Sequence, residues 1–281
     1  MALTTTGRRS RLRATPRLGR VALASGALLL AVTGLAAEAP PAGRLAGQAG
    51  EVVQKSITHV GGWQAWETKR TVQFRKTVTR YRTDGSVERQ RVQMHQYVLR
   101  PELRARIAWE EEGRRIGMVN DGRDAWKLVD GVPGKTQEDR NSARNSTFGS
   151  HYVFGMPFKL TDPGAILQHE GRAPLGRATA DRIKVTYQRG AGDAGGLHTW
   201  VYFFDATTGR LLANNLHYGE GKYDYTEYLD EKPTGGLLLP MRRLGYAANA
   251  KGKIGRRNSE ILYEDVRWNV DLPAPLFARP R

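Results

Sequence analysis

Apolar and polar residues alternate along the chain from about Thr71 to Trp268, and short turns interrupt the alternation. The apolar positions of one such run are Leu103, Ala105, Ile107 and Trp109. A period of two is the spacing of a β-strand with one buried face, and many such strands with short turns form an antiparallel sheet. The sequence therefore predicts a mainly β fold with one large, curved antiparallel sheet.

The alternation and its turn signals divide this region into about ten strands. Asp84 with Gly85 is a hairpin signal between the first two runs. Three further runs lie between Pro101 and Asp130. The remaining expected strands are Thr71–Arg82, Ser86–Leu99, Asp181–Gln188, Thr199–Asp205, Leu211–His217, Lys222–Leu229, Leu237–Ala247 and Glu260–Val270.

Two segments depart from the period of two. In Glu51–Val60 the apolar side chains are spaced as one face of a helix. From Gln137 to Gly164, Asn, Ser, Gly and Pro residues are mixed with aromatic ones, and we expect an irregular insert that serves as a lid. A half-open β-barrel closed by the N-terminal helix and this insert is the fold that these patterns favour.

Residues 1–37 have the three parts of a secretory signal peptide. Six arginines precede the apolar stretch Val21–Ala36, and small residues surround Ala36 and Ala37. That stretch falls short of the roughly 20 residues that a membrane span needs. The Arg8–Arg9 pair suits a twin-arginine signal, but Arg11 stands where an aromatic residue is expected. We interpret 1–37 as a Sec-type signal peptide, 38–50 as a flexible lead-in and 51–281 as a single domain.

Composition narrows the classes of function. The chain has no cysteine, which excludes disulfides, thiolate metal sites, cysteine nucleophiles and the acylated cysteine of a bacterial lipoprotein. The formal net charge is +16, and without the six arginines of the predicted signal peptide it is +10. The basic residues are scattered over polar strand faces, so we expect no nucleic-acid binding. Peripheral contact with an anionic membrane surface is compatible with this charge.

The search for catalytic patterns yields little. The six histidines, His59, His95, His151, His169, His198 and His217, include no pair at the helical spacing of metal ligands. Asp121, Asp124 and Asp130 flank turns, where aspartate is favoured for its hydrogen bonds to the backbone. We therefore predict no catalytic residue, no metal and no cofactor, and a protein that is not an enzyme. The alternative is a hydrolase that uses His151 and Tyr152 of the insert.

Large apolar side chains favour ligand binding. A long antiparallel sheet coils, and its concave face must be filled by a helix or by a ligand. One short helix offers little cover for so many aromatic residues. The expected ligand-binding residues are Phe74, Trp109, Trp126, Tyr152, Phe154, Met156, Trp200, Tyr202 and Phe204.

Several motifs carry a family resemblance. Gly236–Pro240 has the pattern G-L-x-x-P, and Asp205–Leu211 has the pattern D-x-x-T-G-x-L. With these, the sequence resembles the bacterial lipoprotein-localisation (Lol) carrier and receptor superfamily. The segments HVGGWQAW, GSHYVFGMPFKLTDPG and Thr199–Asn214 resemble more closely an uncharacterised family of exported bacterial proteins assigned to that fold. The resemblance implies a half-open barrel whose concave apolar face holds acyl chains, and it assigns no functional residue.

Together these features predict a periplasmic or secreted carrier that holds a lipid, an acyl chain or a lipoprotein on the concave face of the sheet. The expected partner is a lipid or an acylated protein. A sensory or structural protein that binds a peptide on the same face is a further alternative. The identity of the ligand and the oligomeric state are left open by the sequence.

Overall fold

The computed structural model describes residues 45–192 and 195–280. The predicted signal peptide lies outside these residues. Within them, thirteen strands form one sheet with the order β6-β5-β4-β3-β2-β1-β13-β12-β11-β10-β9-β8-β7. All neighbouring strands pair antiparallel. The prediction of a mainly β fold with one large antiparallel sheet is confirmed.

The sheet consists of two meanders that meet in its middle. The first contains β1 (Thr71–Tyr81), β2 (Val87–Val98), β3 (Arg104–Glu111), β4 (Arg114–Asn120), β5 (Ala125–Val129) and β6 (Val132–Pro133). The second contains β7 (Ala165–Leu175), β8 (Ala178–Tyr187), β9 (Thr199–Asp205), β10 (Leu211–Gly219), β11 (Lys222–Thr234), β12 (Leu237–Asn249) and β13 (Gly252–Trp268). The pairing of β1 with β13 joins them. The edges, β6 and β7, are not paired with each other, so the sheet is an open half-barrel.

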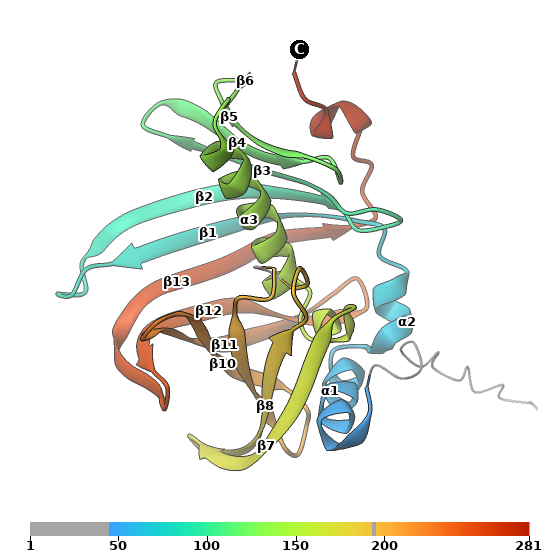
Figure 1. Ribbon diagram of the computed structural model, residues 1–281, viewed down its shortest axis with the longest axis vertical. Coiled ribbons are helices and arrows are strands. Elements are labelled where there is room, and N and C mark those ends of the chain that lie inside the picture. Colours follow the sequence, from blue (N-terminus) through green and yellow to red (C-terminus); the bar gives the residue numbers. More distant parts are fainter. Residues whose placement is uncertain (1–44, 193–194, 281) are drawn as a thin grey trace, which may run out of the picture. The chain divides into compact units, whose positions relative to one another are not determined.

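The helices cover one face of the sheet, which we call the inner face. The chain leaves edge strand β6, forms α3 (Gln137–Phe154) and η1 (Phe158–Thr161), and returns as edge strand β7. Figure 1 shows α3 lying across the sheet between these edges. The helices α1 (Gly47–His59) and α2 (Gly62–Glu67) precede β1, and α1 contacts β7. The short helix η2 (Ala274–Phe277) is an exception, because it contacts β3 on the other face, where the Arg104 guanidinium lies over the Phe277 ring.

The expectation of an irregular insert is wrong for residues 137–154, which form a regular helix. The Thr136 hydroxyl accepts a hydrogen bond from Asp139 N at 3.0 Å, and the Asp139 carboxylate in turn accepts one from Thr136 N. This capping box satisfies two amide groups at the start of α3. The helix is polar on most of its surface, so hydrophobic periodicity does not reveal it.

Strand number was also underestimated, because edge strands carry weak patterns. The strand β7 includes Gly171 and Pro174 and has no fully buried residue, so its alternation is hard to recognise. Proline is tolerated there because an edge strand has unpaired amide positions. The remaining expected strands are present, and β9 has the expected bounds, Thr199–Asp205.

Candidate functional site on the inner face

Half of the inner face is a packed aromatic core. The Phe74 ring lies parallel to that of Phe154 at 4.2 Å, and Trp200 stacks on Tyr202 at 5.6 Å. Phe204 is fully buried beside Tyr202. Stacked pairs of this kind contribute about 0.5–1.5 kcal/mol each beyond their burial. These residues come from β1, β9 and α3, so the core joins both meanders to the helix.

The predicted N-terminal helix supplies part of the cover for this core, and helices that the sequence did not reveal supply the rest. The buried residues packed with it include Val53 and Ile57 of α1, Trp66 of α2, and Met156, Phe158 and Leu160 after α3. Phe74, Tyr152, Phe154, Met156, Trp200, Tyr202 and Phe204, all expected to bind a ligand, belong to this cluster. In this structure their apolar surface is covered by the chain itself.

Trp126 does not lie on the inner face. Residues directly opposite each other in an antiparallel pair share a face, and Trp126 is opposite Val119. The adjacent Ala125 faces the other way, in a cluster with Ala143 of α3. Trp126 instead forms a small outer cluster with Val119 and Leu128. The expectation that Trp126 lines the concave face is wrong. Alternate residues of β5 face opposite sides of the sheet, and Trp126 is on the outer side.

The inner face is hollow where α3 crosses the first meander. A cavity of about 510 Å³ lies between α3 and strands β1–β5. It is lined by Lys76, Val78, Arg80, Arg89, Arg91, Gln93, Ile107, Trp109, Glu111, Ile116, Met118, Lys127, Ser142, Ser146 and Ser150. Trp109 is the expected ligand-binding residue that lines this cavity. Its lining is mixed, with five basic side chains and five apolar ones.

One lysine of this cavity is buried, and no carboxylate in residues 45–192 and 195–280 forms an ion pair with it. Lys76 is 9% exposed, and its Nζ approaches the Ser150 hydroxyl at 3.5 Å. Burial lowers the pKa of Lys76 to about 7, and the positive charges of Arg243 and Arg80 add to this effect. Arg243 is itself buried, with its guanidinium over the rings of Tyr228 and Tyr263.

The histidine and tyrosine of the hydrolase alternative have different surroundings. The His151 ring lies 5.7 Å from that of Tyr97, and burial with the charges of Lys159 and Arg100 holds its pKa well below the usual range. The Tyr152 hydroxyl contacts those of Tyr187 and Tyr202. Burial, the first cause, and these two phenols raise the pKa of Tyr152 well above its usual range. Both side chains are therefore neutral near pH 7 and sit within the packed core.

The motifs behind the family resemblance meet at one corner of the fold. Gly61 has φ +114°, and a Cβ there would lie 2.4 Å from the carbonyl oxygen of Gly236. Leu238 N donates to Val60 O at 3.0 Å beside this contact. The ring of Phe158 stacks on Trp66 at 4.7 Å. Segments distant in sequence thus lie together in one structural joint.

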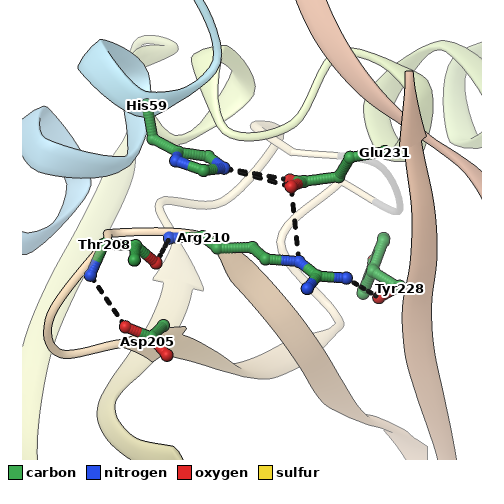
Figure 2. Close-up of polar contacts among 6 residues, drawn as sticks. All are labelled: His59, Asp205, Thr208, Arg210, Tyr228 and Glu231. Carbon is green, nitrogen blue, oxygen red and sulfur yellow. Dashed lines mark hydrogen bonds and ion pairs between the residues drawn. The ribbon is translucent and has the colours of Figure 1, made fainter.

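Figure 2 shows the polar part of this joint. His59 Nε2 lies 3.1 Å from the Glu231 carboxylate, and Arg210 Nε lies 3.4 Å from the same group. Asp205 accepts hydrogen bonds from the amides of Thr207 and Thr208 in the turn between β9 and β10. These contacts fasten α1 to β10 and β11, which is a structural role.

The carboxylates of the turn aspartates accept hydrogen bonds from backbone amides. Asp121 accepts from the amides of Arg123 and Asp124, and Asp130 accepts from Arg115 N. Within residues 45–192 and 195–280, no group of three or more metal-binding side chains comes together. In the same ranges, no helix has the length and apolar character required to span a membrane.

Solved structures share this arrangement. A LolA superfamily protein from Nitrosomonas europaea aligns with 83% of this chain and 98% of its own, with a TM-score of 0.53 and 14% sequence identity. A DUF1329 family protein from Desulfovibrio piger covers the same shares with a TM-score of 0.53 and 9% identity. No protein-family model matches the sequence, and no curated protein is similar to it. The chain therefore has the half-barrel fold of LolA superfamily structures.

Proposed function

We propose that the protein is an extracytoplasmic carrier whose ligand, a lipid or the acyl part of a lipoprotein, occupies the cavity under α3. The observation that carries this proposal is the hollow between α3 and the sheet, whose lining includes the apolar side chains of Ile107, Ile116 and Met118. Its volume, about 510 Å³, is within the usual range of small-molecule sites. The signal-like N-terminal sequence and the carrier fold support an extracytoplasmic role.

The two halves of α3, the helix that covers this cavity, are packed differently against the rest of the protein. The N-terminal half of α3 meets the sheet through the small side chain of Ala143, and near the middle of the helix Asn120 Nδ2 donates to the Thr147 hydroxyl at 3.4 Å. The C-terminal half is anchored in the aromatic core by Tyr152 and Phe154. Segments with few buried apolar contacts open at low free energy. The N-terminal half of α3 is therefore the part that moves to admit a ligand.

The test of this proposal is a substitution on α3 that fills the cavity. Ser146 lines it, whereas Asn145, one residue earlier, is exposed. The change Ser146→Trp places an indole in the space, and Asn145→Trp is the matched control on the same helix. The readout is fluorescence titration with N-phenyl-1-naphthylamine, an uncharged apolar probe.

We expect the wild type and the Asn145→Trp variant to bind the probe alike, and Ser146→Trp to bind it at least about tenfold more weakly, since the apolar contact area is lost. Equal binding by all three proteins would mean that the probe sits elsewhere. No binding by the wild type would favour the alternative of a protein partner.

A further inference from the structure

Cationic side chains gather in the cavity. Five of its lining residues are basic: Lys76, Arg80, Arg89, Arg91 and Lys127. In the register of β1 and β2, Arg80 is opposite Arg89, and Lys76 is opposite Gln93. Like charges directly opposite each other destabilise an antiparallel pair. The sheet therefore holds positive charge here at a cost to its own stability.

Negative charge within the cavity balances a part of this cluster. Glu111 is the carboxylate among the lining residues. It pairs with Arg91 and lies 3.5 Å from Arg89. Lys76 is not part of that pairing, and its pKa is lowered first by burial and then by the repulsion from Arg243 and Arg80. An anion that enters the cavity relieves this repulsion.

Hydrogen-bond donors face the cluster from the helix. Ser142, Ser146 and Ser150 lie four residues apart along α3, so their hydroxyls share one side of it. In the part of the chain that the structure describes, Arg91 Nε is buried with no hydrogen-bond partner. Hydroxyl and guanidinium groups are the donors that phosphate and carboxylate oxygens accept.

We propose that this cavity binds the anionic headgroup, a phosphate or a carboxylate, of an amphiphilic ligand, between the basic cluster on β1, β2 and β5 and the serines of α3. The inference rests on the proposed function and specifies the ligand class. The apolar residues Val78, Ile107 and Met118 of the same cavity receive the first part of the attached chain. The ligand is thus an anionic amphiphile and not a neutral lipid.

The experiment compares three probes on one set of proteins. Displacement of N-phenyl-1-naphthylamine measures the affinity for monododecyl phosphate, for 1-dodecanol and for inorganic phosphate. The variants are Lys76→Met and Arg80→Gln, which keep side-chain bulk and remove one charge each. Arg123→Gln, in an exposed turn between β4 and β5, is the matched control.

For the wild type we expect monododecyl phosphate to bind at least about tenfold more tightly than dodecanol, because hydrogen bonds to a charged group are among the stronger ones. Each cavity variant should lose most of this preference and keep its dodecanol affinity, which also shows that it is folded. Arg123→Gln should behave as the wild type.

Equal affinities for the phosphate and the alcohol in the wild type would overturn the headgroup inference and leave the carrier proposal standing. Binding of none of the apolar probes would overturn the carrier proposal itself. Displacement by inorganic phosphate as strong as that by monododecyl phosphate would support an anion site and assign it to a free anion instead of a headgroup.

Discussion

At the scale of single residues, Lys76 is the most informative position. In the unfolded chain its pKa is near 10.5, and in the folded protein burial and then the neighbouring arginines lower it to about 7. Between these values the unfolded chain binds more protons than the folded one, so the free energy of unfolding rises with pH. Below pH 7 the lysine is charged in both states and its full penalty is present.

The prediction concerns Lys76→Met. At pH 6 this variant should be more stable than the wild type by up to about 5 kcal/mol, since each pKa unit corresponds to about 1.4 kcal/mol. The gain should shrink from pH 7 to pH 9 as the wild-type lysine loses its proton. Urea denaturation at these pH values measures both. Parallel pH profiles for the two proteins would show that Lys76 keeps an ordinary pKa.

Other groups near Lys76 also affect stability, so the free energy of unfolding of the wild type and of the variant must be compared at each pH. The groups around it on neighbouring elements and on its own strand are Arg80, Gln93, His95, Ser150, Arg243 and Tyr263. Burial, first, and the charge of Lys76 lower the pKa of His95 well below its usual range. His95 of the unfolded chain therefore titrates around its ordinary pKa of 6.5, and the comparison above about pH 7.5 isolates the lysine.

At the scale of elements, α3 decides access to the cavity. The chain has no cysteine, so an engineered pair forms a unique disulfide. Asn120 on β4 and Thr147 on α3 face each other, since their side chains share a hydrogen bond of 3.4 Å, and we choose them for the cysteine pair.

We predict that the oxidised Asn120→Cys/Thr147→Cys variant releases N-phenyl-1-naphthylamine at least about tenfold more slowly than the wild type, because opening of α3 is blocked. Reduction should restore the rate, and the two single-cysteine variants are the controls. Stopped-flow dilution gives the release rates. A rate that does not depend on the redox state would mean that α3 stays closed during exchange.

At the scale of the whole molecule, the inner face has a packed half and a hollow half, and matched substitutions distinguish them. Phe204 is fully buried in the packed half, so Phe204→Ala should cost about 3–5 kcal/mol of stability and leave the cavity intact. Trp109 lines the cavity and lies against Arg91 at 4.6 Å. Trp109→Ala should weaken probe binding by about 1–2 kcal/mol with a smaller loss of stability.

Thermal unfolding and probe titration on both variants check this division. Loss of probe binding in a folded Phe204→Ala protein would extend the site into the aromatic core. The residues named from the sequence as ligand contacts would then bind after all, through opening of the core.

A sequence pattern predicts only those features of the structure that neighbouring positions in the chain determine. Alternation within a strand is local, so the faces of Phe74 in β1 and Trp200 in β9 could be read from their neighbours. In β5, five residues long, the run is too short to show which face Trp126 takes. The residues of the α3 capping box, Thr136 and Asp139, are a local pattern. The helix that follows them is polar and has no apolar stripe, so hydrophobic periodicity does not predict it.

The sequence by itself determined the sheet, its antiparallel character and the helix before it, because period, turn residues and apolar faces are properties of adjacent positions. The tertiary structure decided which large side chains are covered and which line a space. That outcome depends on α3 crossing from one edge to the other and on neighbours far apart in sequence, such as Phe74 with Phe154. It also decided the environment of Lys76, since Arg243 comes from β12 and Ser150 from α3.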